Sequence, residues 1–324
     1  MSKRKVKNNC TVSQIARCWL EDIRISVKES TYTRYWRITD KYILPHLGNV
    51  QIVEIDCLCI NRFTENMLSN GGMRQTGLAP KTVTDVLCVL KSILKFARQQ
   101  GYECASLDGV RFPQRRARNV SILTAESREL LESLVLYRQD STSVGVLLSL
   151  FTGLRIGEVC GLKWSDIDTK AQLLHIRRTV ERILDLDPDA VKKTKIVVSE
   201  PKTANSLRVI PLPAFLGNIL ADLAGEHDTY ILTGTEKPME PHCFYLRYRR
   251  FMEKNEIGGY SFHALRHTFA TRCVEVGFDT KSLSEILGHS NVSTTLSFYV
   301  HPSIEQKRAQ MEKLNPISVP AFSP

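Results

Sequence analysis

Residues 261–301 read SFHALRHTFATRCVEVGFDTKSLSEILGHSNVSTTLSFYVH and bring together reactive side chains of several kinds. His263 and Arg266 stand three residues apart in a helical pattern, so both side chains point the same way. An imidazole and a guanidinium on one helix face can hold a phosphate and exchange a proton with it. His289 follows a glycine turn, and Tyr299 stands ten residues beyond it. This stretch therefore predicts a site for phosphate chemistry.

Two motifs further upstream add basic side chains to this set. Arg155, in Thr-Gly-Leu-Arg-Ile-Gly-Glu, follows a glycine break that leads into a new helix, whose N-terminal N–H groups favour an anion. Glu158 lies one turn further on and could hold Arg155 in place. Lys202, in Pro-Lys-Thr, precedes turn-forming residues between two strand-like runs, which predicts a hairpin. Taken singly, Arg155 and Glu158 fit a structural ion pair equally well, and a lysine such as Lys202 is ordinarily a surface residue.

The pattern around these motifs predicts a chain that is mainly α-helical with a small antiparallel β-sheet. In the first third, helices are expected over 12–23, from Ser30 to just before Pro45, from Asp56 to Gly71 and from Pro80 to Gly101. Further on, helices are expected at about 124–137 and 141–151, strands at 174–176, 196–198 and near 209, and helices again after Pro213. A helical first domain and a mixed α/β second domain follow from this order.

The length of 324 residues suits two domains, each with its own core. Residues 109–120 combine Gly, Pro and several arginines without a helical apolar face, which is typical of a linker. We therefore expect a basic tail over 1–9, a helical domain over 10–108, a basic linker over 109–120 and a mixed α/β domain over 121–324.

The positive charge is concentrated in the first third of the chain. Residues 1–118 contain 20 Lys and Arg against 10 Asp and Glu, whereas residues 119–324 contain 24 against 24, so the whole net charge of +10 comes from the first part. Such asymmetry favours a polyanionic partner, above all nucleic acid, over a merely soluble basic domain. Candidate phosphate contacts are Arg34, Arg37 and Lys41, expected on one helix face, and Arg115, Arg116 and Arg118 in the linker. For both groups, a solvated charged surface is the alternative.

Other features of the sequence restrict the class of protein. Nine cysteines, an odd number at scattered spacing, indicate thiols in a reducing cytoplasm, and we expect them to be small core residues. No apolar run approaches the roughly 18 to 20 residues of a membrane span, and no apolar stretch follows the basic N-terminus. A zinc site at His263, His267 and His289 is disfavoured, since Arg266 would place a fixed cation beside the metal.

Taken together, these motifs resemble the catalytic set of the tyrosine recombinases, also called the phage integrase family. The similarity is greatest to integrases of phages and conjugative transposons, and it covers roughly residues 120–310. The matching set, in the family's order, is Arg155, Lys202, His263, Arg266, His289 and Tyr299. The resemblance implies a core-site DNA-binding domain over 10–108 and a catalytic domain over 121–324. A C-terminal tail after Tyr299 would dock on its own domain or on a neighbouring protomer.

The resemblance also implies a mechanism with neither a cofactor nor a metal. Tyr299 would attack a backbone phosphate of double-stranded DNA, leave a 3′-phosphotyrosyl link and release a 5′-hydroxyl. Arg155, Arg266 and His289 would bind the non-bridging oxygens as charge develops there. His263 is the candidate base and Lys202 the candidate general acid. No nucleotide is needed, because one phosphoester replaces another, and the chain has no GxxxxGK[ST] loop.

Family members act as tetramers on paired core-type attachment sites, and some use accessory DNA-bending or directionality factors. Only about nine residues precede the first expected helix, which leaves no room for an additional arm-binding domain and favours a recombinase acting at core sites. Two alternatives stay open: a non-catalytic DNA-binding protein derived from an integrase, and a relaxing enzyme similar to type IB topoisomerases. Tyr260 is the nearest other candidate nucleophile.

Overall fold

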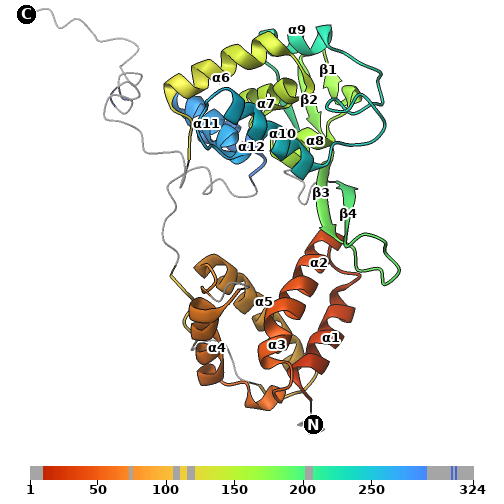
Figure 1. Ribbon diagram of the computed structural model, residues 1–324, viewed down its shortest axis with the longest axis vertical. Coiled ribbons are helices and arrows are strands. Elements are labelled where there is room, and N and C mark those ends of the chain that lie inside the picture. The colour runs from red at the N-terminus through yellow and green to blue at the C-terminus, as the bar shows by residue number, and fades with distance from the viewer. Residues whose placement is uncertain are drawn as a thin grey trace, which may run out of the picture. The chain divides into compact units, whose positions relative to one another are not determined.

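The structure is a computed structural model that describes residues 10–72, 76–104, 110–114, 121–200 and 207–289, with the single positions 308 and 311. Its contacts divide the chain into two compact units (Figure 1). Unit 1 comprises residues 1–118 and 183–195, and unit 2 comprises residues 119–182 and 196–324. Unit 1 has one hydrophobic core, and unit 2 has a large core with a small satellite cluster.

Unit 1 is built from helices, as its sequence pattern predicts. They are α1 (Val12–Ile23), α2 (Glu29–Ile38), a π-helix (Thr39–Ile43), α3 (Leu44–Leu47), a 3₁₀ turn (Ile52–Glu54), α4 (Cys57–Asn70) and α5 (Pro80–Gln99). Local chemistry sets the helix starts: Thr11 forms a capping box with Gln14, and the Asp56 carboxylate accepts from the Cys59 N–H at 2.7 Å. The apolar face of α5 packs against α1, α2 and α4 and forms the centre of the core.

The second helix differs from its prediction at both ends. Lys28, not Ser30, is the N-cap of α2, and the helical path does not stop before Pro45 but continues to Leu47. A π-helical turn makes this possible, because the Leu44 N–H donates to the Thr39 carbonyl five residues back. Wider turns relieve the clash between a proline ring and the preceding turn, and proline lacks an N–H in any case.

Unit 2 surrounds short strands with helices, and the predicted fold class, mainly α with small antiparallel sheets, is confirmed. Its helices are α6 (Ala125–Arg138), α7 (Ser141–Thr152), α8 (Ile156–Gly161), a 3₁₀ turn (Trp164–Asp166), α9 (Ala214–Asp222), α10 (Pro241–Lys254), α11 (Phe262–Glu275) and α12 (Thr280–Leu287). The strands are β1 (Ile167–Asp168), β2 (Leu173–Ile176), β3 (Thr179–Leu184), β4 (Thr194–Ser199) and β5 (Arg208–Pro211); the outer part of β3 and β4 is grouped with unit 1.

The strands form two sheets, not one. One sheet has the order β1-β2-β5, with Leu174 opposite Ile210 and Ile176 opposite Arg208, and β3 pairs separately with β4. The sequence pattern missed β3 and predicted a hairpin around Lys202. Lys202 itself lies outside the described residues, but the strands that flank it belong to different sheets, so the hairpin prediction is wrong. Pairing with β2 buries Leu174, Ile176 and Ile210 together, which a local pattern does not reveal.

The cysteines do not follow the expectation that all are core residues. No disulfide forms among the nine, all of which are described. Only Cys160 and Cys273 are buried, whereas Cys18, Cys88 and Cys243 are exposed on helices. Whether a cysteine is buried depends on its position relative to the apolar face of its helix, and composition alone does not reveal that position.

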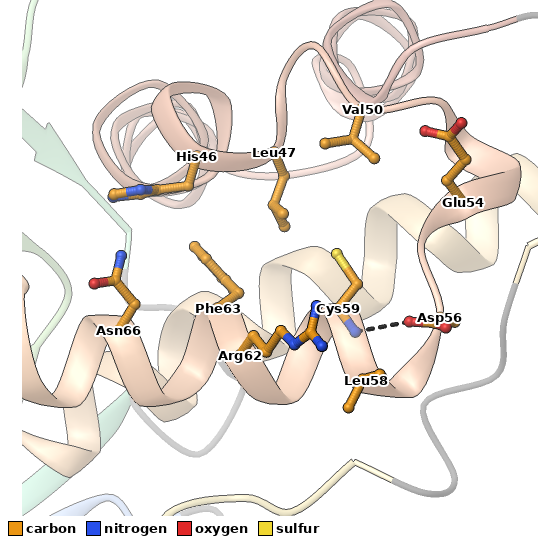
Figure 2. A pocket seen from close by; sticks show the side chains of 10 residues that line it. All are labelled: His46, Leu47, Val50, Glu54, Asp56, Leu58, Cys59, Arg62, Phe63 and Asn66. Atoms are coloured by element: carbon orange, nitrogen blue, oxygen red, sulfur yellow. Dashed lines mark hydrogen bonds between the residues drawn. The ribbon is translucent and has the colours of Figure 1, made fainter.

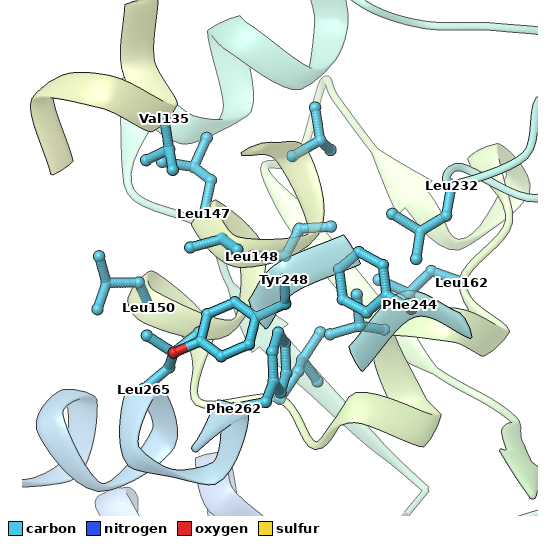
Figure 3. Packing of buried hydrophobic residues seen from close by; sticks show 14 of the residues in the cluster. Val135, Leu147, Leu148, Leu150, Leu162, Leu232, Phe244, Tyr248, Phe262 and Leu265 are labelled. Carbon is cyan, nitrogen blue, oxygen red and sulfur yellow. The ribbon is translucent and has the colours of Figure 1, made fainter. Parts of the chain in front are cut away.

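Helix α7 forms the centre of unit 2 and contacts α6, α8, α10 and α11. Beside it, the rings of Phe244 and Tyr248 meet the ring of Phe262 edge to face, with centroids 5.5 and 5.2 Å apart (Figure 3). Such pairs add to the stability of a core beyond the area that they bury. Because Phe262 opens α11, this aromatic cluster fixes the helix that carries His263 and Arg266.

Gly145 in α7 provides a test of this packing. A Cβ at this position would lie 2.4 Å from Cζ of Phe244. Alanine is the better helix former by about 1 kcal/mol, yet overpacking typically costs about 1–3 kcal/mol. We therefore expect Gly145→Ala to lower the free energy of unfolding by about 1–2 kcal/mol in urea titrations. In a Phe244→Leu background the same substitution should be neutral or stabilising, and a stabilised single variant would contradict the packing argument.

Candidate active site

Arg155 is placed by a sharp break between two helices. Helix α7 ends at Thr152, Gly153 adopts a left-handed conformation with φ of 68°, and Arg155 is the N-cap of α8. Its backbone N–H and Nη1 donate to the two oxygens of Glu158, at 2.8 and 3.1 Å. The prediction that Glu158 holds Arg155 is therefore confirmed. Because Glu158 is only 4% exposed, this contact fixes one edge of the Arg155 guanidinium.

Arg266 links three segments of unit 2. Its side chain is almost completely buried, with 2% of the residue exposed. Nη1 donates to the Gly153 carbonyl at 2.7 Å and Nη2 to the Leu287 carbonyl at 2.6 Å. Arg155 also donates to the Leu287 carbonyl, at 3.4 Å. The helix break before α8, helix α11 and the end of α12 are thereby held together.

His289 follows directly from the end of α12. Asp279 caps the start of this helix, and Gly288 ends it in a left-handed conformation with φ of 65°. The His289 N–H then donates to the Ser284 carbonyl at 3.0 Å. This arrangement explains why a Gly-His pair is useful here, since glycine allows the chain to turn and the histidine next to it is held by the helix end.

The histidines of the site favour their neutral forms. His289 is partly buried, and desolvation together with the charges of Arg266, Arg155 and Arg208 lowers its pKa to about 4. His263 is exposed at the surface, but the surrounding protein still desolvates its ring. This desolvation, with His267, Arg266 and Arg155, lowers the pKa of His263 to about 4. The rings of His263 and His267 meet edge to face with centroids 4.5 Å apart.

The structure therefore brings together four of the six predicted catalytic residues: Arg155, His263, Arg266 and His289. Lys202 and Tyr299 lie outside the described residues, as do Arg115, Arg116 and Arg118. The alternative nucleophile, Tyr260, is described, and its hydroxyl accepts from the Thr124 N–H at 3.4 Å, at the start of α6. In unit 1, Arg34, Arg37 and Lys41 are exposed, and Arg34 forms an ion pair with Asp85 at 3.0 Å.

Arg208 is a member of the cluster that sequence reasoning missed. Its guanidinium donates to both oxygens of Glu158, each at 3.0 Å. Arg208 and Ile210 are two residues apart in β5 and thus on one face of the sheet, where Ile210 is 2% exposed. The sequence did contain a clue to this role, because Arg208 alternates with the apolar Ile210 in a strand-like pattern and is therefore expected on the same buried face.

Two further observations concern binding of other groups. Within the described ranges, no cluster of three or more His, Cys, Asp or Glu side chains could hold a metal ion. Unit 1 has a hollow of about 480 Å³. Figure 2 shows its lining, which mixes apolar side chains with the polar or charged side chains of His46, Glu54, Asp56, Arg62 and Asn66. Both carboxylates act locally, Glu54 on the Gln51 N–H and Asp56 on the Cys59 N–H. The hollow contains no member of the predicted catalytic set.

Sequence comparison agrees with the geometry of unit 2. The model of the family described as "Phage integrase family" matches residues 129–306, more than half of the chain. The chain belongs to the phage integrase family. A second model, for the phage integrase N-terminal SAM-like domain, matches residues 11–68. The resemblance to the tyrosine recombinases, a family of DNA strand-transferring enzymes, is therefore confirmed.

Several individual relatives and solved structures match this chain over most of its length. A "Tyrosine recombinase XerC-like" protein of Caldanaerobacter subterraneus subsp. tengcongensis is 28% identical, covering 95% of this chain and 84% of its own. The "ICEBs1 integrase" of Bacillus subtilis is 23% identical over 92% and 80%. The Tn1549 transposon integrase in complex with transposon right end DNA has a TM-score of 0.72 at 23% identity, covering 95% of this chain and all of that one. A lambda integrase dimer bound to a COC′ core site has a TM-score of 0.63 at 16% identity, covering 90% and 78%.

The lowered pKa values of the two histidines predict how stability depends on pH. In the folded protein both rings resist protonation, whereas in the unfolded chain they titrate near their ordinary pKa of about 6.5. The unfolded state therefore binds more protons, and stability present above about pH 6.5 is lost as the pH falls toward about 4.

We expect wild-type protein to lose more stability over this pH range than the variant His263→Asn/His289→Asn, measured by urea unfolding at several pH values. His227→Asn is the control, because that side chain is 81% exposed and lies outside the group of arginines that lowers the two pKa values. If the free energy of unfolding falls with pH equally in the wild type and in the double variant, His263 and His289 are not held neutral in the folded protein.

Proposed function

We propose that this chain is a site-specific recombinase that cleaves and rejoins DNA through a 3′-phosphotyrosyl intermediate and integrates or excises a mobile element. The observation that supports this most is the cluster of Arg155, His263, Arg266 and His289, which three separate segments supply in a member of the phage integrase family. Tyr299 is the proposed nucleophile and Lys202 the proposed general acid.

The arginines suit the transition state of phosphoryl transfer. Each of Arg155 and Arg266 uses part of its guanidinium on protein oxygens, which fixes its plane and orientation. Fixed donors stabilise charge on the non-bridging oxygens without having to reorganise during the reaction. We assign the phosphate-facing donors of both arginines, and one ring nitrogen of His289, to this task.

The low pKa of His263 bears on its proposed role as base. A neutral imidazole can accept a proton, but a pKa of about 4 makes it a weak base for a tyrosine whose ordinary pKa is about 10. A bound phosphate would offset the charges of Arg155 and Arg266, and would therefore raise the pKa of His263. We infer that DNA binding makes His263 a stronger base and thus ties proton transfer to the presence of substrate.

The partners follow from this function. We propose that double-stranded DNA binds at core-type sites, that the exposed cations Arg34, Arg37 and Lys41 contact its phosphates, and that four protomers act on two paired sites. A lambda integrase tetramer bound to a Holliday junction supports such an assembly by its similar fold. Accessory DNA-bending or directionality factors and a cytoplasmic location complete the proposal. Among the described residues, no helix is long and apolar enough to cross a membrane.

The nucleophile can be tested by covalent capture. A pool of nicked duplexes with randomised central positions would be incubated with the protein, so that cleavage releases a short strand and traps the enzyme. We expect wild-type protein to give a product that resists denaturation and Tyr299→Phe to give none, because phenylalanine has no attacking oxygen. The sequenced product then supplies a defined substrate.

Tyr260→Phe is the matched control and should form the covalent product, since its hydroxyl bonds to the start of α6. Capture by Tyr299→Phe would identify a different nucleophile. DNA binding without any capture by wild-type protein would favour a non-catalytic binding protein, and relaxation of supercoils without strand exchange would favour a topoisomerase-like enzyme.

Lys202 can be tested by chemical rescue. Lys202→Ala should cleave ordinary DNA about 10²- to 10⁴-fold more slowly, because the leaving 5′-oxygen then departs without a proton. A substrate with sulfur in place of that bridging oxygen needs no proton and should restore the rate in a single-turnover assay. Lys170→Ala, at an exposed turn in unit 2, should leave both rates unchanged. Equal slowing on both substrates would remove the general-acid role.

A further inference from the structure

Arg208 occupies an unusual position for an arginine on a short strand. It is the first residue of β5, and its side chain is only 6% exposed. Nη1 and Nη2 donate to the two oxygens of Glu158, and Nε donates to the Ile286 carbonyl at 2.6 Å. All three nitrogens of the guanidinium therefore donate to protein oxygens, which fixes its plane and its orientation.

Glu158 is the shared acceptor of two arginines. It receives the backbone N–H and Nη1 of Arg155 on one side and the bidentate pair from Arg208 on the other. A buried carboxylate needs such partners, because an uncompensated charge in the interior is costly. Arg208 supplies two of the four hydrogen bonds that Glu158 accepts from the two arginines. The position of Glu158, and with it that of Arg155, therefore depends on Arg208.

The second contact of Arg208 is with the end of α12. The last carbonyls of a helix lack partners within the helix and carry its negative dipole end. Arg208 binds the Ile286 carbonyl, and Arg155 and Arg266 bind the Leu287 carbonyl. Three guanidinium groups thus hold the turn from which His289 follows two residues later. Of these, only Arg208 comes from the strand that begins six residues after Lys202.

We propose that Arg208 is a positioning residue for strand transfer, which fixes Arg155 through Glu158 and fixes His289 through the end of α12. This inference rests on the proposed function and deepens it. It adds to the site a residue that acts through Glu158 and through the end of α12. The same side chain links β5 to Glu158, the partner of Arg155, and to the end of α12.

The loss of Arg208 would have a definite electrostatic consequence. Burial by itself raises the pKa of Glu158, but the hydrogen bonds and charge of Arg208, aided by Arg155, lower it below the ordinary value. Without Arg208, Glu158 would accept a proton at higher pH than in the wild type. Its contact with Arg155 would then weaken on the acid side of the pH profile, where His263 and His289 also face the site from α11 and from the end of α12.

The experiment compares Arg208→Gln, Glu158→Gln and the double variant with wild-type protein on the captured DNA substrate. We expect Arg208→Gln to slow covalent cleavage at saturating DNA by about 10- to 100-fold with little change in DNA affinity, because small misplacements of catalytic groups cost rate. The acid limb of the pH–rate profile of Arg208→Gln should shift to higher pH, because without the charge of Arg208 both Glu158 and His289 accept a proton more readily. Glu158→Gln/Arg208→Gln should show a smaller shift, because position 158 no longer titrates and only the contribution of His289 is left.

Arg178→Gln is the matched control. Arg178 also forms a buried ion pair in unit 2, with Asp166 at 2.6 Å, but it contacts none of the four site residues in these bonds. This variant should lose thermal stability, because Asp166 loses a partner, yet it should keep the wild-type acid limb and cleavage rate. A wild-type rate and pH profile in Arg208→Gln, or the same shift in Arg178→Gln, would overturn the inference.

A second readout is independent of DNA cleavage. The melting temperatures of wild type, both single variants and the double variant should be strongly non-additive, with the double variant more stable than Arg208→Gln because no buried carboxylate is left half-paired. Additive losses would overturn the Arg208–Glu158 coupling even if cleavage occurs. If the losses in melting temperature are non-additive but wild-type protein never forms a covalent product, the proposed function is wrong and the Arg208–Glu158 coupling stands.

Discussion

The buried guanidinium of Arg266 is the interaction on which the rest of the site depends. A charge that is removed from water must be satisfied by protein oxygens, and Arg266 finds them in the carbonyls of Gly153 and Leu287. Those carbonyls belong to the helix break before Arg155 and to the helix end before His289. One side chain therefore sets the distance between segments that are far apart in the chain, and its burial makes that geometry rigid.

The cluster is strongly cationic, which has both a cost and a use. Arg155 and Arg208 share a single buried carboxylate, Glu158, and Arg266 adds a third guanidinium that binds backbone carbonyls, so the local charge is positive without substrate. This excess lowers the pKa of His289 and His263 and stores an unfavourable interaction in the folded protein. An anion that enters would relieve it. The same charges that would destabilise the empty site therefore favour a phosphate, a trade of stability for binding common at functional sites.

The sequence predicted most of this arrangement where the signal was local. Glycine breaks and helical periodicity located α7 and the helix that carries His263 and Arg266, and they placed Arg155 and His289 directly after glycine turns. Predictions failed where a tertiary contact outweighs a local rule. A π-helical turn carries the chain past Pro45, and pairing of β5 with β2 removes the expected hairpin at Lys202.

By itself the sequence determined the family, the helical character of both units and the identity of the proposed catalytic groups, because spacing along a helix and glycine turns are properties of neighbouring residues. Only the tertiary structure decided which groups share a carbonyl, which arginine is buried and which histidines stay neutral. Those properties depend on desolvation and on charges brought together from α8, β5, α11 and α12. Arg208 illustrates the difference. The sequence shows that an arginine stands at this position, but only the fold places its guanidinium against Glu158 and so gives it a role.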